Sequence, residues 1–227
     1  GLSLAGDLLV QRAATASGTD LAAANLQPTL HITRGTTSAG LSLSLQRQDV
    51  AGARFRTTRA LQLHATRTDG AGHWSVLLEG GTGRHPATLA ELDLHTRSAL
   101  LQRHWPKPLP GVDSADVSVP IARERNQQGL GELSRRAHML TASLTGSLGA
   151  ARWNAGLGVR RSRFDDTVFP GEPPRTDSMR FVDLSLQWPL GPVLALRADL
   201  HAVRNASTTR LYAMDWRSVG LSLVAQW

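Results

Sequence analysis

The stretch Val182-Asp183-Leu184-Ser185-Leu186-Gln187-Trp188 decides the fold, because apolar and polar residues alternate in it without a break. Successive side chains of a β-strand point to opposite faces, so this pattern predicts a strand with one apolar and one polar face. The same alternation runs through Leu41-Ser42-Leu43-Ser44-Leu45-Gln46, Leu61-Gln62-Leu63-His64 and Val117-Ser118-Val119-Pro120-Ile121. The sequence therefore predicts an all-β protein.

Alternating segments of this kind follow one another along the whole chain. We count twelve, near residues 1–13, 24–34, 39–48, 56–68, 72–83, 90–104, 112–125, 134–148, 151–164, 177–189, 192–204 and 210–227. Several reach the length of about 9–11 residues that a tilted membrane strand needs. An even number of antiparallel strands places both ends of the chain on one side.

The connections between these segments differ in length on the two sides. Tight turns are expected at Thr36-Thr37-Ser38, Asp69–Gly72, Gly149-Ala150 and Pro189–Pro192, and longer loops lie between them, most clearly from Asp165 to Ser178. The Pro-rich connection from Pro106 to Asp113 is long for the short-turn side. Short periplasmic turns and longer extracellular loops are typical of outer-membrane barrels.

We therefore predict one transmembrane antiparallel β-barrel domain over residues 1–227, with about twelve strands and both termini periplasmic, in the outer membrane of a Gram-negative bacterium. Mean hydropathy is only −0.19, as expected where apolar residues alternate with polar ones. The sequence contains no cysteine, which excludes disulfides and thiolate metal sites. Gly1-Leu2-Ser3-Leu4 already has strand character, so we expect the chain to be the C-terminal part of a longer secreted precursor.

A soluble β-sandwich or a lipocalin-like barrel would also alternate, and the direction of the apolar face separates these folds. If the leucines and valines point outward, the opposite positions form a polar lumen that carries both signs of charge. The charged and histidine side chains predicted in that lumen are Asp93, Arg97, Asp183, Arg197, Asp199 and His201.

Tryptophans and arginines fall at opposite ends of the predicted strands, on the outward face. Trp74, Trp153, Trp188 and Trp227 are expected in a periplasmic aromatic girdle, where indole rings lie at headgroup level. A terminal Trp227 also resembles the signal that the barrel assembly machinery recognises. The arginines expected to face lipopolysaccharide phosphates at the outer boundary are Arg12, Arg47, Arg59, Arg84, Arg123, Arg125, Arg136, Arg161, Arg163, Arg180, Arg204 and Arg217.

The excess of arginine has a second explanation. The net charge is +7 and Lys107 is the single lysine, which codon bias alone would produce. Codon bias does not account for the placement of the arginines toward one end. Because this placement lies on a predicted membrane boundary, we do not expect a nucleic-acid partner.

We predict no catalytic residues, no metal site and no cofactor. His138 faces lipid near the outer end, where an outer-leaflet lipid hydrolase would place its histidine, with Ser134 or Ser162 as the nucleophile to be considered. Scattered histidines without cysteine or a paired motif do not define a metal site.

The last fifty residues carry a more specific pattern, in Asn205, Ser207, Tyr212, Asp215, Arg217, Gly220 and Leu221. This hairpin resembles that of the C-terminal barrel in the surface lipoprotein assembly modifier family and in related porins with tetratricopeptide repeats. The resemblance implies a periplasmic helical-repeat domain ahead of the barrel and a role in moving lipoproteins or another polymer to the cell surface.

Three functions follow as expectations. The first is an outer-membrane conduit or assembly platform for export of a lipoprotein or polymer. The second is a narrow passive porin for small solutes, and the third is an outer-membrane lipid-modifying enzyme. The expected partners are outer-membrane lipid and lipopolysaccharide, the barrel assembly machinery through the C-terminal strand, and a periplasmic repeat domain or exported substrate.

Overall fold

The computed structural model describes the backbone of residues 2–13, 21–51 and 53–225, and the side chains of residues 22–51 and 53–225. Within these ranges the chain is almost entirely β-structure. The strands are β1 (Leu2–Ala13), β2 (Leu21–Arg34), β3 (Thr37–Val50), β4 (Ala53–Asp69), β5 (Gly72–Arg84), β6 (Leu94–Leu109), β7 (Val112–Asn126), β8 (Arg135–Leu148), β9 (Ala151–Phe164), β10 (Thr176–Pro189), β11 (Leu194–Ser207) and β12 (Met214–Ala225). Three 3-10 helices lie in connections: η1 (Ala87–Leu92), η2 (Gly131–Leu133) and η3 (Arg210–Tyr212).

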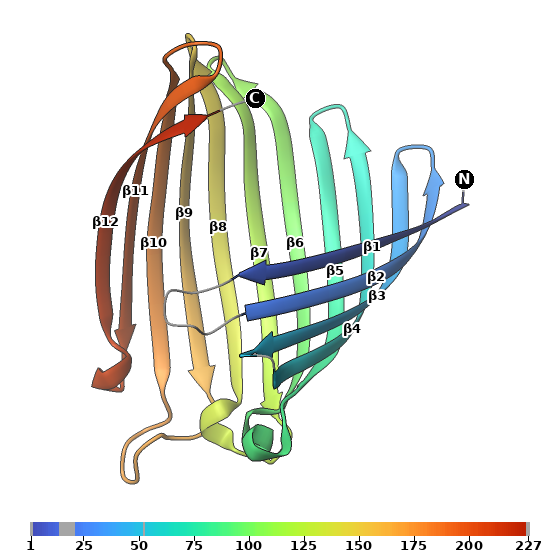
Figure 1. Ribbon diagram of the computed structural model, residues 1–227, viewed down its shortest axis with the longest axis vertical. Coiled ribbons are helices and arrows are strands. Elements are labelled where there is room, and N and C mark those ends of the chain that lie inside the picture. Colours follow the sequence, from blue (N-terminus) through green and yellow to red (C-terminus); the bar gives the residue numbers. More distant parts are fainter. Residues whose placement is uncertain (1, 14–20, 52, 226–227) are drawn as a thin grey trace.

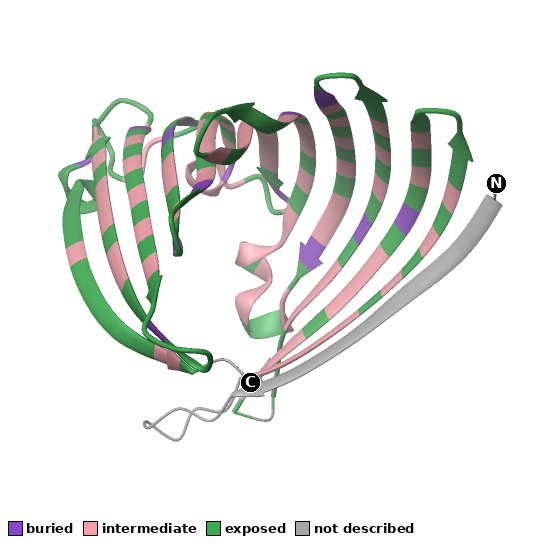
Figure 2. Cartoon of the chain, turned by 90° about the horizontal axis from the view of Figure 1, so that it is seen from above, coloured by how far each residue is buried: buried purple, intermediate pink, exposed green. Residues whose placement is uncertain are grey.

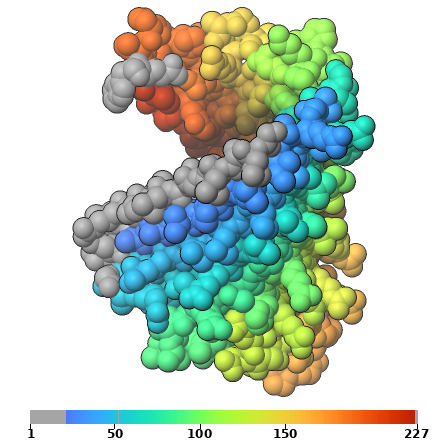
Figure 3. All heavy atoms as spheres, turned by 90° about the vertical axis from the view of Figure 1, so that its right-hand side faces the viewer, coloured from blue at the N-terminus to red at the C-terminus, as the bar shows by residue number. Residues whose placement is uncertain are grey.

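Each strand pairs antiparallel with the next one in the chain, and the sheet order is β1 to β12 without a crossover. The sheet curls around a central space, as the views along its side and down its length show (Figures 1 and 2). The pairings of the described strands do not include one between β12 and β1. Figure 3 shows the molecule hollowed between the blue N-terminal strands and the orange and red C-terminal ones.

Leucines of the alternating stretches lie on the outer face, as the sequence predicts. Leu43, Leu63, Leu184 and Leu196 are all exposed, and similar exposed leucines and valines occur on β2 through β12. Among the described hydrophobic residues only Ala60, Ala151, Phe164 and Ala195 are buried. A soluble sandwich or lipocalin-like barrel needs a packed apolar interior, so this distribution identifies the inside-out pattern of a transmembrane β-barrel.

Within the described residues, no helix is both long enough and apolar enough to cross a lipid bilayer.

The turns at one end of the barrel are short. Strands β2/β3, β4/β5, β6/β7 and β8/β9 are each joined by two residues. The connection expected to span Pro106 to Asp113 is also this short, because β6 continues to Leu109 with an irregularity in its pairing between Pro106 and Leu109. Leu2 and Ala225 begin and end the sheet at this same end, which is the periplasmic end in barrels of this class.

The opposite end carries the longer connections, with one exception. Residues 85–93, 127–134, 165–175 and 208–213 join strands there. Strand β3, however, ends at Val50 and β4 begins at Ala53, so this connection is also short. The segments expected to start at residues 90 and 210 begin later, since η1 and η3 occupy their first residues.

Candidate functional site

The inner face of the sheet is lined by polar side chains that bond to one another across strands. On β2 to β5, Gln27 Nε2 donates to Gln62 Oε1 at 3.0 Å, and Gln62 Nε2 donates to Glu79 Oε2 at 2.6 Å. Thr29 and Ser42 share a hydrogen bond of 2.9 Å beside them. Because each amide both donates and accepts, these groups form a continuous polar strip along the wall.

Histidines extend this strip toward the short-turn end. His31 and His64 stack with ring centroids 5.6 Å apart, and His73 and His104 stack at 4.7 Å. His104 Nδ1 lies 3.0 Å from Asp116 Oδ1, which also accepts from Gln102 at 3.1 Å. The inner wall on this side therefore combines neutral amides, imidazoles and carboxylates.

The facing wall, on β10 and β11, holds four of the charged or histidine side chains predicted in the lumen. His201 Nδ1 and Asp183 Oδ1 are 2.6 Å apart, on directly paired positions. Arg197 Nε donates to Asp199 Oδ1 at 2.9 Å. In each of these two pairs on the inner face, a carboxylate contacts an imidazole or a guanidinium group.

The remaining two predicted lumen residues lie elsewhere. Asp93 is in the β5–β6 connection, where its Oδ1 accepts a hydrogen bond from the His85 backbone N–H at 2.6 Å. Arg97 lies on the outer face, since it pairs directly with Arg123 and shares its parity with exposed Leu101. The prediction that Asp93 and Arg97 point into the lumen from a strand is therefore wrong.

The loop containing η1 lies within the ring of strands when the barrel is viewed from above (Figure 2). It is held by Asn126, which is only 2% exposed. Asn126 Nδ2 donates to the carbonyl oxygens of Glu91 and Asp93, and its Oδ1 accepts from the backbone N–H groups of Gln128 and Leu130. One side chain thus fixes two loops at the mouth opposite the short turns.

The arginines expected at the outer boundary occupy outward positions in the loop-proximal part of their strands. They share parity with exposed leucines and valines, and the side chain of Arg12 lies outside the described residues. The described members are Arg47, Arg59, Arg84, Arg123, Arg125, Arg136, Arg161, Arg163, Arg180, Arg204 and Arg217. Arg47, Arg123 and Arg217 form ion pairs with Asp49, Asp165 and Asp215, respectively.

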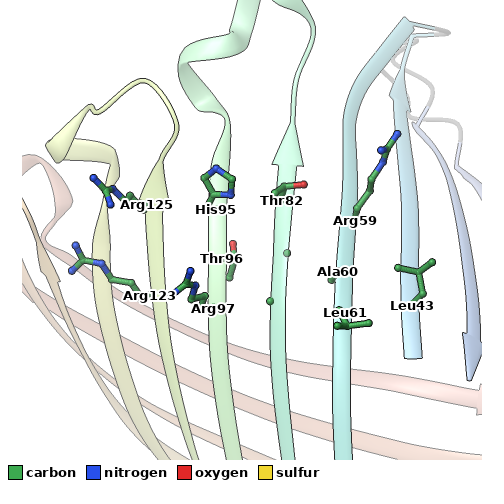
Figure 4. Close-up of a pocket in the computed structure, with 12 residues that line it drawn as sticks. Leu43, Arg59, Ala60, Leu61, Thr82, His95, Thr96, Arg97, Arg123 and Arg125 are labelled. Atoms are coloured by element: carbon green, nitrogen blue, oxygen red, sulfur yellow. The ribbon is translucent and has the colours of Figure 1, made fainter. Parts of the chain in front are cut away.

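Several of these cations surround one hollow on the outer face, which we call the arginine groove (Figure 4). It has a volume of about 700 Å³ and extends over β3 to β7. Its lining includes Arg59, Thr82, His95, Arg97, Arg123 and Arg125 around Gly80, with Leu43 and Leu61 on the β3/β4 side. Arg97 is the member that sequence parity assigned to the wrong face.

Tryptophans lie at the short-turn end, opposite the arginines. Trp74 and Trp188 are exposed on the outer face and Trp153 is half-buried, while Trp227 lies outside the described residues. Arg103 is buried between Trp74 and Trp105, with its guanidinium carbon 5.0 Å and 5.4 Å from the two ring centres. Trp105 therefore joins this group, although it was absent from the predicted girdle.

His138 does not form the catalytic pair considered for a lipid hydrolase. It pairs with Arg161 on the outer face, whereas Ser162 is the next residue on β9 and points inward, where it is buried. Ser134 is also buried and donates its hydroxyl to the carbonyl oxygen of Leu130 at 3.0 Å. Neither serine is positioned to be activated by His138.

The described residues contain no group of three or more histidine, aspartate or glutamate side chains arranged to hold a metal ion.

The residues of the C-terminal resemblance shape the β11–β12 connection. Asn205 Nδ2 donates to the carbonyl oxygen of Tyr212 at 2.7 Å, and Ser207 Oγ accepts from the backbone N–H of Thr209. The Arg175 guanidinium carbon lies 3.7 Å from the Tyr212 ring centre and 3.6 Å from that of Phe164. The motif therefore ties this hairpin to the preceding long loop.

No protein-family model matches the sequence, and no curated protein sequence matches it. Among solved structures, the chain is similar to a copper transporter, OprC, with a TM-score of 0.49 and 12% sequence identity. The similarity covers 98% of this chain and 40% of OprC, so the chain corresponds to less than half of that protein's length.

Proposed function

We propose that the protein is a bacterial outer-membrane β-barrel whose polar lumen passes small hydrophilic solutes. The observation that carries this proposal is the division between the two faces of one curled sheet. Exposed leucines and valines cover the outside, while hydrogen-bonded amides, imidazoles and carboxylates line the inside. Such a division suits lipid on one side and water on the other.

The η1 loop favours small solutes over folded cargo. It lies within the outline of the barrel and is fixed by the buried Asn126 side chain, so it narrows the passage at the loop end. The hydrogen-bonded pair Asp183–His201 and the ion pair Arg197–Asp199 would then be close to any solute that passes. The outer-membrane location and the periplasmic position of the short turns are parts of the same proposal.

Purified protein, refolded into a planar lipid bilayer, should give discrete ion-conducting steps. The Arg197→Glu variant should shift ion selectivity toward cations, because substitutions that face the lumen tune selectivity. Arg204→Glu on the same strand places the same charge change on the outer face and should leave selectivity unchanged. Absence of conductance from correctly refolded protein, or equal shifts in both variants, would count against a channel.

A second proposal rests on the resemblance of the final hairpin to the surface lipoprotein assembly modifier family. In it the barrel is a conduit or platform for export of a lipoprotein or polymer, working with a periplasmic repeat domain. Asn205, Ser207 and Tyr212, which carry the resemblance, organise the β11–β12 loop. Loss of surface-exposed lipoprotein in cells lacking the protein, measured by protease accessibility, would favour this function over a passive channel.

A further inference from the structure

The arginine groove is built in rows that follow the pairing of the strands. One row, nearest the loops, consists of Arg125, His95, Thr82 and Arg59 on β7, β6, β5 and β4. The next row toward the middle of the barrel consists of Arg123, Arg97, Gly80 and Leu61 on the same strands. A third row, Ile121, Ala99, Leu78 and Leu63, is wholly apolar.

The change from cations to apolar residues occurs over only a few residues along each strand. It therefore marks the boundary between lipid headgroups and acyl chains on this face of the barrel. A ligand that fits both sides of the boundary needs negative charge toward the loops and hydrocarbon toward the middle of the barrel.

The positive charges of the groove are largely uncompensated within the described part of the chain. Arg59, Arg97 and Arg125 have no carboxylate partner there, and Arg97 lies directly across from Arg123, a like-charge pairing that disfavours the sheet by itself. Arg123 does pair with Asp165, at 2.6 Å, but its Nη1 is buried without a hydrogen-bond partner. An anion in the groove would remove this repulsion and accept from these donors.

The hollow itself is formed by Gly80, whose position on the outer face carries no side chain. A Cβ atom built at Gly80 would meet no atom within 4 Å, so the space above it is open. Arg97 and Leu61 flank it on the two neighbouring strands. The cations lie on both sides of this opening, across β4 to β7, a width of about 14 Å for three strand spacings.

We infer that the arginine groove binds a diphosphorylated, acylated disaccharide of the outer leaflet, the lipid A portion of lipopolysaccharide. Arg97, Arg123 and Arg125 contact one phosphate, and Arg59 contacts the phosphate at the other end of the disaccharide. The sugar lies over Gly80 and the acyl chains run along Leu43 and Leu61. The inference rests on the proposed outer-membrane location, but not on the passage of solutes through the lumen.

A phospholipid fits this groove less well, because it has one phosphate and would leave part of this broad row of cations unpaired. The shared requirement is phosphate, so the probes must vary the phosphate number and the attached lipid. Suitable probes are diphosphorylated lipid A, monophosphorylated lipid A, phosphatidylglycerol and inorganic phosphate, each added to the refolded barrel in detergent micelles. Native mass spectrometry and thermal unfolding then report binding directly.

Two variants and one matched control test the site. Arg97→Gln with Arg125→Gln removes two groove charges, and we expect lipid A to bind about tenfold or more weakly. Gly80→Val keeps every charge but fills the hollow, and should weaken lipid A binding as well. Arg34→Gln with Arg67→Gln removes two exposed arginines at the opposite, short-turn end of the barrel and should change the affinity less than about twofold.

The expected order of affinity is diphosphorylated lipid A, then monophosphorylated lipid A, then phosphatidylglycerol, with no measurable effect of inorganic phosphate. Equal binding of phosphatidylglycerol and lipid A would overturn the inference, as would equal losses in the groove and control variants. Heat-dependent gel migration of each variant checks that it is folded. Because conductance is measured separately, failure here leaves the proposed channel function intact, and the reverse also holds.

Discussion

Arg103 is held by three groups at the short-turn end of the barrel. Its two terminal nitrogens donate to the carboxylate oxygens of Asp69 at 2.7 Å and 2.9 Å, and the guanidinium lies against the indoles of Trp74 and Trp105. Planar guanidinium groups suit both the bidentate and the stacked contact, whereas an ammonium group suits neither as well. This arrangement fixes both indoles at the short-turn end, the level at which the proposed membrane placement puts the lipid headgroups.

Replacing Arg103 by lysine keeps the charge but removes the forked hydrogen bonds and the stacking. We expect the denaturant midpoint of unfolding in lipid vesicles to fall, because two charge-assisted hydrogen bonds and the stacked contacts are weakened together. Tryptophan fluorescence during guanidinium titration would measure it. Arg152→Lys, an exposed arginine at the same end, serves as the control and should not shift the unfolding midpoint; equal shifts in both variants would contradict the special role of Arg103.

The loop elements depend on a single buried amide. The Asn126 side chain forms hydrogen bonds with backbone groups of both the η1 and the η2 connections. Its own backbone N–H donates to Ser134 Oγ at 2.9 Å. Because neither short helix has a side-chain cap of its own, these contacts fix their positions. The order of the loop end therefore comes from side chains at strand ends, and not from helix propensity.

Asn126→Asp is an almost isosteric change that keeps the acceptor for Gln128 and Leu130 but removes the donor to Glu91 and Asp93. We expect η1 to open more often, with proteolytic cleavage in residues 87–92 rising about tenfold, since a lost buried hydrogen bond costs about 1–3 kcal/mol. Channel conductance should rise in parallel. Unchanged cleavage and conductance in Asn126→Asp would show that η1 does not restrict the passage.

The positions of many strands are predictable from period-2 alternation, because every strand of a membrane barrel has an apolar outer face and a polar inner face. Strands β7, β8, β9 and β10 begin and end within a residue or two of the expected positions. The 3-10 helices η1 and η3 are not predictable this way, since the sequence pattern includes their residues in the strands that follow them. The short β3–β4 connection also carries no turn signal strong enough to set its length.

Arg97 shows why part of the candidate site could not be predicted. Leu92 and Leu94 suggest that Asp93 and Arg97 face inward, but Leu92 belongs to η1 and the adjacent Leu100-Leu101 pair gives no parity. The register decides the face, since Leu101 pairs with the outward Val76 and Val119. Membership of the groove likewise depends on which strands are neighbours, a property of the folded sheet.

At the scale of the whole molecule, β1 and β12 are the edges of the sheet, and each has a hydrogen-bonded neighbour on one side alone among the described strands. On β12, Val219, Leu221 and Leu223 are 78%, 74% and 66% exposed, whereas outward leucines on inner strands such as Leu43 and Leu184 are 43% and 44% exposed. The difference arises because β12 has a neighbour on one side alone among the described strands. An unpaired edge inside a bilayer is strongly unfavourable.

We therefore predict that β12 pairs with β1 when the protein is inserted in lipid. Unheated protein should migrate differently from boiled protein on a semi-native gel, as closed barrels do. Hydrogen exchange should then protect consecutive amides of β12, whereas an edge strand protects alternate ones. Identical migration and alternate protection would show that the sheet stays open under these conditions.

The uninterrupted β1-to-β12 order also determines how the protein folds. Eleven strand pairings join neighbours in sequence, and each closes a connection of between two and eleven residues. Joining β1 to β12 closes nearly the whole chain instead, which costs roughly 3 kcal/mol more in loop-closure entropy. Hairpins should consequently form early and the seam last, so a factor that holds the first and last strands together would accelerate assembly more than one that assists any hairpin.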